Sequence, residues 1–114
     1  EEAKKLAKKS GGRITELEKP KEAVENADVV YTDTWISMGD EKTKKKRLEI
    51  FKPYQVTETL MGLAKKDTIF MHDMPAYRGN EVESSVIDGP KSVIFDQAGN
   101  RLHAQKAVLA ILMK

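Results

Sequence analysis

One acidic residue, Asp33, stands where an apolar run gives way to a polar segment. Its carboxylate could hold the ammonium group of a ligand through a charge-assisted hydrogen bond. The alternative is a turn or helix-capping residue, and from the pattern alone this alternative is somewhat favoured because aspartate is common in turns. Ser37, Met38 and Gly39 follow, and the glycine would let a ligand approach the backbone closely since it has no side chain.

A second polar group occupies residues 72–75, which read His-Asp-Met-Pro. His72 could donate to a phosphate or carbonyl oxygen, although a lone histidine is more often part of the hydrogen-bonded structure. Asp73 suggests acid–base chemistry, but adjacent residues of an extended strand point to opposite faces. A direct His72–Asp73 pair is therefore not expected while the chain stays extended. The other histidine, His103, is expected to be structural, because two histidines so far apart do not have the spacing of a metal site.

The third polar group runs from Asp96 to Arg101, and Arg101 is predicted to open the last helix. A guanidinium beside the free N–H groups of a helix amino terminus would suit a phosphate or a carboxylate. A surface salt bridge is the alternative, and position alone does not separate the two interpretations.

Short apolar runs and helix-forming segments alternate along the chain, and these elements must position the polar groups. Strands are predicted over residues 13–18, 28–34, 67–72 and 92–96. Helices are predicted over residues 1–9, 20–27, 41–51, 56–64, 84–88 and 101–113. The last of these is expected to face inward with Leu102, Val108, Leu109 and Leu112. Pro20 suits the first turn of its helix, Thr57 could cap another, and residues 10–12 supply a helix stop.

This alternation predicts an α/β fold, a three-layer arrangement with a mainly parallel sheet. In such sheets ligands bind beyond the carboxyl ends of the strands. Each of the three polar groups follows or ends a predicted strand. The sequence therefore predicts that they converge on one crevice.

Composition limits the classes of function. The 114 residues suit one domain, and a content of 39% hydrophobic and 33% charged residues is typical of a soluble globular protein. The 20 basic residues are matched by 18 acidic ones along most of the chain, so no nucleic-acid partner is expected. The chain has no cysteine, which excludes disulfides and cysteine-based metal sites, and we expect neither a metal nor a cofactor. No apolar run approaches the ~20 residues of a membrane span, and the start lacks the pattern of a signal peptide.

Three motifs together resemble the ornithine carbamoyltransferases, in the order that this family has them. Residues 32–39, TDTWISMG, resemble the family's ornithine-loop signature, and residues 72–76, HDMPA, are similar to its His-Cys-Leu-Pro segment. Residues 88–107, DGPKSVIFDQAGNRLHAQKA, resemble its carboxyl-terminal signature almost throughout. The first and third motifs are highly specific, and the resemblance extends over essentially the whole chain.

The resemblance implies an ornithine-binding domain with the Rossmann-like fold of half a carbamoyltransferase. Members of the family transfer a carbamoyl group from carbamoyl phosphate to the side-chain amine of L-ornithine, which gives citrulline and phosphate. By the resemblance, Asp33 holds the ornithine α-amino group, and Ser37 and the Met38 backbone complete that site. Arg101 matches an arginine that contacts carbamoyl phosphate, and Met74 matches a residue whose backbone carbonyl touches the ligands.

Asp73 departs from the family pattern, which has cysteine near the reacting amine. We assign Asp73 the catalytic role and a contact with carbamoyl phosphate on the strength of the resemblance. A carboxylate could accept a proton or fix the ornithine ammonium, but it is a weaker base than a thiolate. The second hypothesis is a non-catalytic amino-acid-binding module, and a carbamoyltransferase for a different amine is a variant of the first. A third hypothesis, a purely structural α/β domain, is disfavoured because three motifs coincide.

The family's carbamoyl-phosphate loop, Ser-Thr-Arg-Thr, does not occur in these 114 residues, and neither does its His-Pro motif. We therefore expect residues 1–114 to be an incomplete ornithine-binding domain without the carbamoyl-phosphate domain. The chain begins as though inside a helix, which also suggests a fragment. The resemblance further implies arginine biosynthesis, a cytoplasmic location, and a homotrimer or higher assembly of the full-length enzyme.

Overall fold

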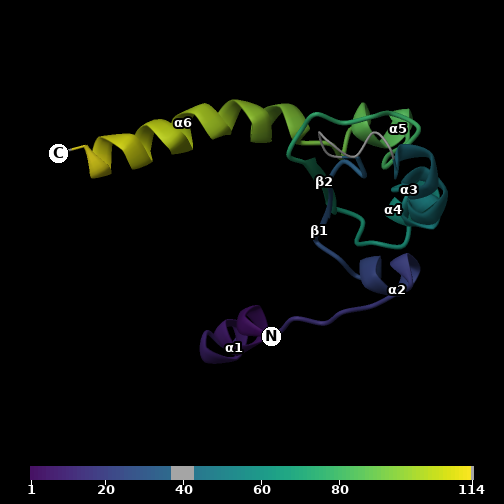
Figure 1. Ribbon diagram of the computed structural model, residues 1–114, viewed down its shortest axis with the longest axis horizontal. Coiled ribbons are helices and arrows are strands. Elements are labelled where there is room, and N and C mark those ends of the chain that lie inside the picture. Colours follow the sequence, from purple (N-terminus) through teal and green to yellow (C-terminus); the bar gives the residue numbers. More distant parts are fainter. Residues whose placement is uncertain (37–42, 114) are drawn as a thin grey trace.

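The computed structural model describes residues 1–36 and 43–113, which form an α/β fold (Figure 1). In chain order the elements are α1 (Glu2–Lys9), α2 (Pro20–Val24), β1 (Val29–Thr32), α3 (Lys44–Phe51), the 3-10 helix η2 (Lys52–Tyr54), α4 (Glu58–Met61), β2 (Ile69–His72), α5 (Ser84–Ile87) and α6 (Ile94–Leu112).

Strands β1 and β2 are parallel, with Val29 opposite Ile69 and Thr32 opposite His72. Both are built from β-branched, aromatic and other large side chains that suit a pleated, half-buried surface. On its other side β2 is flanked by residues 91–93, since the Phe70 N–H donates to the Lys91 carbonyl at 2.8 Å and the Val93 N–H donates to the Phe70 carbonyl at 3.0 Å. The prediction of an α/β fold with a parallel sheet is confirmed.

The hydrophobic core covers the face of the sheet that carries Val30 and Phe70, and Phe70 is completely buried. Helices α2, α4 and α5, the first turn of α6 and two loop residues supply its other members: Val24, Val56, Leu60, Met61, Val82, Val86, Ile87 and Ile94. On the opposite face Val29 and Tyr31 are about half exposed, at 46% and 53%. The core thus fixes β1 and β2 from one side.

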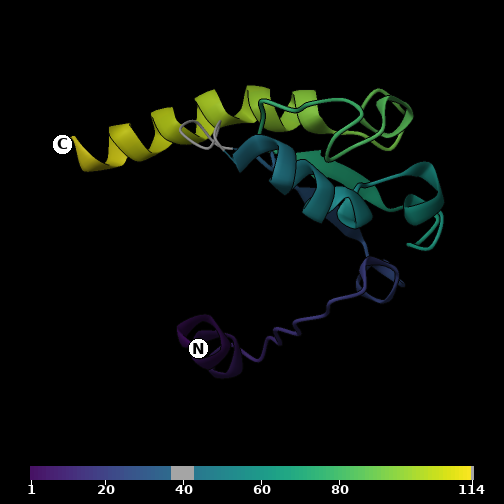
Figure 2. The same ribbon diagram turned by 45° about the vertical axis from the view of Figure 1, so that its right-hand side comes forward.

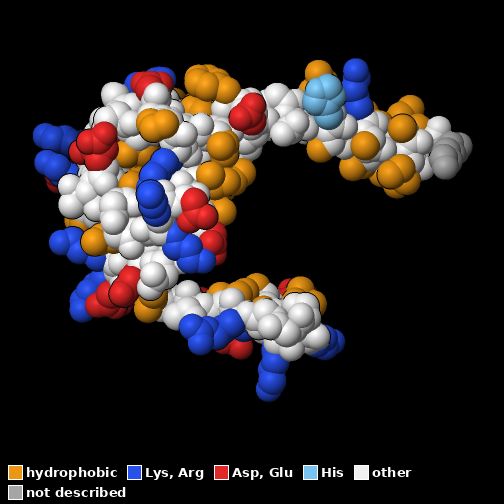
Figure 3. Space-filling model, turned by 180° about the vertical axis from the view of Figure 1, so that it is seen from behind, with side chains coloured by type: hydrophobic (Ala, Val, Ile, Leu, Met, Phe, Trp, Pro, Cys, Tyr) orange, Lys and Arg blue, Asp and Glu red, His pale blue; other side chains and the backbone are white. Residues whose placement is uncertain are grey.

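Helix α6 extends away from this body over most of its length (Figures 1 and 2). Ile94 is the only buried residue of its described part, and hydrophobic side chains lie exposed along it (Figure 3). Leu102, Val108, Leu109 and Leu112 were predicted to face inward, and this prediction is wrong because the described chain offers no surface against that part of the helix. No described helix is both long and apolar enough to cross a membrane.

Two predicted strands are also wrong. Residues 13–18 form no strand and are exposed, because no described strand lies beside them to take up their backbone hydrogen bonds. Of residues 92–96, Ser92 makes an isolated parallel bridge with Phe70, and α6 begins at Ile94. The first part of this apolar run therefore pairs with the side of β2 that does not face β1, and the rest forms the first turn of α6.

Three local signals in the sequence are confirmed. Helix α1 ends at Lys9, and Gly11 has a positive φ of 76°, as the predicted glycine stop requires. Pro20 is the first residue of α2. The Thr57 side chain caps α4 by accepting a hydrogen bond from the Leu60 N–H at 3.0 Å.

Candidate functional site

Asp33 and Asp73 follow paired residues at the same edge of the sheet. Because Thr32 pairs with His72 in a parallel ladder, each aspartate is the first residue beyond its strand. Neighbouring strands lie about 4.8 Å apart, so both residues belong to one narrow region of the surface. Both are exposed. The structure therefore places the first two predicted polar groups at the same end of the sheet.

The Asp33 carboxylate already has one contact within the chain. Its Oδ1 accepts a hydrogen bond from the Thr34 N–H at 2.6 Å. This contact belongs to the turn that follows β1, which is the role that the sequence pattern alone slightly favours. It uses one of the two carboxylate oxygens, so a turn role and a ligand contact are compatible.

Asp73 stands at the start of a sharply turned segment. Met74 has a positive φ of 62°, the Met74–Pro75 peptide bond is cis, and the Met74 N–H donates to His72 Nδ1 at 2.9 Å. Asp73 Oδ1 lies 3.4 Å from the same nitrogen. Because that nitrogen accepts from the Met74 N–H, it has no proton to donate to Asp73. His72 and Asp73 are thus close, but this ring nitrogen does not join them by a hydrogen bond.

His72 is a buried structural residue, as the more ordinary of its two interpretations predicted. Its side chain is fully buried, and its Nε2 lies 3.2 Å from Glu81 Oε1. With Nδ1 acting as the acceptor, Nε2 carries the proton and donates to this carboxylate. Glu81 Oε1 also accepts from the Tyr77 N–H at 2.6 Å. This network ties the end of β2 to the loop that follows Asp73.

Glu81 escaped the sequence analysis, because a glutamate in a polar loop carries no sign of burial. It is only 1% exposed, and its Oε2 has no hydrogen-bond partner within the described chain. A buried carboxylate is costly unless it is hydrogen-bonded, which explains why Oε1 takes two donors. In the described chain, no group of three His, Cys, Asp or Glu residues could hold a metal ion.

Gln97 is a second residue that the sequence analysis missed. Its Oε1 accepts from the His72 N–H at 3.1 Å, and its Nε2 donates to the Tyr31 hydroxyl oxygen at 3.2 Å. The side chain therefore joins the ends of both strands. An indication was present in the sequence, since Gln97 lies within the third polar group, between Asp96 and Arg101.

Arg101 is not at a helix terminus, so the argument from free N–H groups is wrong. Helix α6 begins at Ile94, which places Arg101 about two turns inside it, where backbone N–H groups bond within the helix. Its side chain is exposed. The role that the resemblance gives to Arg101 stays a prediction. Ser37 and Met38 lie outside the described residues.

A small cavity lies beside the strand ends, with a volume of about 70 Å³. Its lining comes from the turn after β1, the start of α3 and the loop after β2: Thr34, Trp35, Ile36, Lys44, Tyr77, Asn80 and Glu81. Trp35 stacks on Phe51 with ring centroids 6.0 Å apart, which supports one wall. Sites for small molecules usually enclose ~300–1,000 Å³, so this cavity is too small for a whole substrate.

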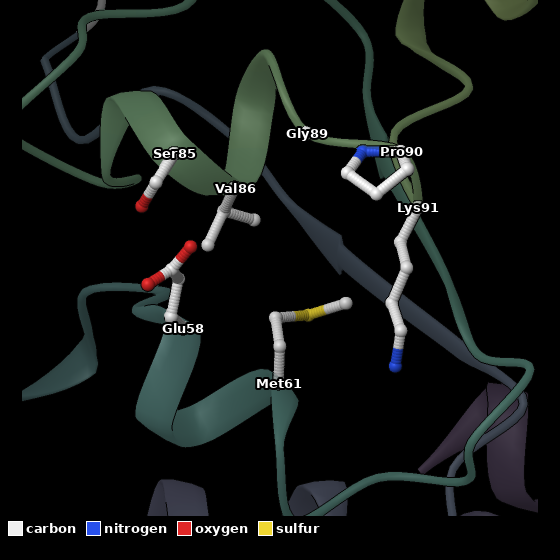
Figure 4. Close-up of a pocket in the computed structure, with 7 residues that line it drawn as sticks. All are labelled: Glu58, Met61, Ser85, Val86, Gly89, Pro90 and Lys91. Atoms are coloured by element: carbon white, nitrogen blue, oxygen red, sulfur yellow. The ribbon is translucent and has the colours of Figure 1, made fainter.

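A larger pocket of about 220 Å³ lies between α4 and α5 (Figure 4). Its lining residues are Glu58, Met61, Ser85, Val86, Gly89, Pro90 and Lys91. Gly89 has no room for a side chain because a Cβ there would collide with the Ser85 carbonyl oxygen. None of the described site residues, Asp33, Asp73, Met74 and Arg101, lines this pocket, so it is separate from the end of the sheet that carries Asp33 and Asp73.

An ion pair anchors the loop that follows Asp73. Arg78 Nε and Nη2 donate to the two carboxylate oxygens of Asp88 at 2.8 and 2.6 Å. These hydrogen bonds lower the pKa of Asp88 and raise the pKa of Arg78 from their ordinary values. Both side chains are about half exposed, so the pair contributes little to the stability of the fold. Its effect is to connect the loop to the end of α5.

Comparison with known proteins gives a consistent result. A family model described as "Aspartate/ornithine carbamoyltransferase, Asp/Orn binding domain" matches residues 1–112. The ornithine carbamoyltransferase of Caldicellulosiruptor saccharolyticus is 58% identical over 110 residues, which are 96% of this chain and 36% of that protein. The chain therefore spans about a third of the length of the relatives that it matches.

Solved structures agree with this result. The ornithine carbamoyltransferase from Pyrococcus furiosus superimposes with a TM-score of 0.88 at 55% identity, over 95% of this chain and 34% of that one. An N-acetyl-L-ornithine transcarbamylase superimposes with a TM-score of 0.80 at 31% identity, over 95% of this chain and 33% of that one. The fold is thus shared with solved carbamoyltransferase structures.

Proposed function

The chain belongs to the aspartate/ornithine carbamoyltransferase family, and we propose that it is the ornithine-binding part of an ornithine carbamoyltransferase. In the reaction, the side-chain nitrogen of L-ornithine attacks the carbamoyl carbon of carbamoyl phosphate. A C–N bond forms, the C–O bond to phosphate breaks, and the nitrogen loses a proton to give L-citrulline. The observation that carries the proposal is the position of Asp33 and Asp73 beyond paired residues of two parallel strands, where open α/β sheets bind ligands.

The residues are proposed to divide the two substrates between them. Asp33 holds the ornithine α-ammonium group, and Ser37 and Met38 complete that part of the site. Met74 and Arg101 contact carbamoyl phosphate. Asp73 lies at the reacting amine and also meets carbamoyl phosphate. The turn at Met74 supports this division, because it directs the chain away from the strand immediately after Asp73.

The resemblance supports further proposals about the full-length protein. We propose that it acts in arginine biosynthesis, in the cytoplasm, and as a homotrimer or higher assembly. No cofactor takes part in the proposed reaction.

The first test of this function is which amine the full-length protein uses as the carbamoyl acceptor. We expect the full-length protein to form citrulline from L-ornithine and carbamoyl phosphate, and to use L-aspartate and N-acetyl-L-ornithine far less well. N-acetyl-L-ornithine is included because an N-acetyl-L-ornithine transcarbamylase has a similar structure at 31% identity. Measuring kcat/KM for the three acceptors decides the question. A preference for N-acetyl-L-ornithine would replace the proposed substrate, and the absence of any transfer would support the non-catalytic alternative.

The second test concerns Asp73. An ionised carboxylate beside the ornithine side-chain amine favours the ammonium form, which helps binding but opposes the deprotonation that precedes attack. The Asp73→Asn variant of the full-length enzyme is therefore expected to have a higher KM for ornithine and a kcat–pH profile displaced toward lower pH. The profile of kcat is informative because it reports groups in the enzyme–substrate complex.

A matched control lies just before the other end of the same strand. Asp67 is exposed and lies just before β2, at the opposite edge of the sheet. Asp67→Asn should change neither the ornithine KM nor the pH profile. If Asp73→Asn behaves like Asp67→Asn, Asp73 is a turn residue without a part in the reaction.

A further inference from the structure

The hydrogen bonds around Gln97 replace a missing strand contact. Residues 91–93 run parallel to β2, and the Phe70 N–H and carbonyl bond to Lys91 and Val93. Continuation of this ladder would offer the Val93 carbonyl to the His72 N–H. That carbonyl instead accepts from the Gln97 N–H at 2.9 Å, at the start of α6. Gln97 then provides its own side-chain oxygen to the His72 N–H at 3.1 Å.

The same side chain also reaches β1. Gln97 Nε2 lies 3.2 Å from the hydroxyl oxygen of Tyr31, which is 66 residues away in the sequence. Tyr31 is two residues before Asp33, and His72 is immediately before Asp73. One partly buried amide therefore touches both strands close to the points where the two aspartates leave the sheet.

We propose that Gln97 is a positioning residue for the amine-binding site, in that it fixes the separation and direction of the chain at Asp33 and Asp73. The inference rests on the proposed function of these two aspartates. Gln97 does this by holding the last N–H of β2 and the Tyr31 hydroxyl with one side chain. It acts on the substrate only through its neighbours and takes no part in the chemical step.

The chemistry of the two contacts distinguishes possible replacements. The position needs an acceptor for the His72 N–H and a partner for the Tyr31 hydroxyl. Glutamate meets both needs, because the hydroxyl can donate to its second oxygen. Methionine has a similar length and meets neither. Gln97→Glu should therefore preserve the function that Gln97→Met loses.

The experiment compares four variants of the full-length enzyme: Gln97→Met, Gln97→Glu, Tyr31→Phe and Gln105→Met. Gln105 is the control, an exposed glutamine farther along α6. Hydrogen exchange at the His72 amide, resolved by residue with mass spectrometry, should be about two- to tenfold faster in Gln97→Met. The ornithine KM should rise in that variant more than the carbamoyl phosphate KM does, because Asp33 is proposed to contact ornithine alone and Asp73 to contact both substrates.

Gln97→Glu should keep both the exchange rate of the His72 amide and the ornithine KM near the wild-type values. Tyr31→Phe should raise the ornithine KM less than Gln97→Met does. Gln105→Met should match the wild type in both measurements. The inference is overturned if the His72 amide exchanges at the wild-type rate in Gln97→Met, or if exchange accelerates while the ornithine KM is unchanged. It is also overturned if both KM values rise equally, since general destabilisation would then account for the effect. Absence of citrulline formation by the wild type would reject the proposed function instead, and the exchange rates would still report on the Gln97 contacts.

Discussion

The 114-residue chain by itself is expected to form no citrulline, even with saturating ornithine and carbamoyl phosphate. Asp33, Asp73 and Met74 are exposed, and the cavity beside them is only about 70 Å³. Much of an enzyme's rate gain comes from holding two reactants together in a site that excludes water. The sequence that the family uses to hold carbamoyl phosphate, Ser-Thr-Arg-Thr, does not occur in these residues. These residues alone are therefore expected to be insufficient for catalysis.

The measurement is citrulline formation by the chain and by the full-length protein at equal concentration. The full-length protein should turn over at an ordinary enzymatic rate of ~1–1,000 per second. Citrulline formation with the 114-residue chain should be no faster than the uncatalysed reaction in buffer without protein. Circular dichroism of the chain must show mixed helix and strand, so that an unfolded sample is not mistaken for an inactive one. Turnover by the chain in the ordinary range would mean that both substrates are held by these residues alone.

The strands β1 and β2 could be predicted because their sequences leave few alternatives. Each is a short run of β-branched and large apolar residues that ends in a polar group. Such runs suit a buried parallel strand, and the position of Asp33 and Asp73 at one edge follows from parallel pairing. The part of the site that depends on strand ends was therefore predictable from the sequence.

The beginning of α6 could not be predicted in the same way. Residues 92–95 read Ser-Val-Ile-Phe, which suits a strand as well as a helix. Only Ser92 bridges to β2, and Ile94 turns into the core as the first residue of the helix. The helix then places Gln97 against the strands and leaves Arg101 on an exposed surface. Tertiary contacts decided this boundary, and local propensity did not.

The buried pair of His72 and Glu81 shows a second limit. The two residues are nine positions apart and belong to a strand and a loop, so no helical or strand period connects them. Their contact depends on how the loop folds back after the turn at Met74. The position of His72 at a strand end is visible in the sequence, but its buried partner Glu81 is visible only in the structure.

Asp33→Asn in the full-length enzyme is expected to weaken ornithine binding by about 10- to 150-fold. The loss of a hydrogen bond between two charged groups costs about 1.5–3 kcal/mol, and each 1.4 kcal/mol is a factor of ten in affinity. Carbamoyl phosphate binding should change much less, because Asp33 is proposed to contact only the α-ammonium group of ornithine. Calorimetric titration of each substrate separates the two effects.

Asparagine is the informative replacement because it separates the two roles of Asp33. Its side-chain oxygen can still accept from the Thr34 N–H, as Asp33 Oδ1 does at 2.6 Å, so the turn after β1 is preserved while the charge is removed. Asp28→Asn is the control, since Asp28 precedes the same strand at its other end and pairs with Lys65 at 2.6 Å. That variant should bind ornithine like the wild type. If Asp33→Asn also does so while Asp33→Ala does not, the residue caps a turn and the ammonium group is held elsewhere.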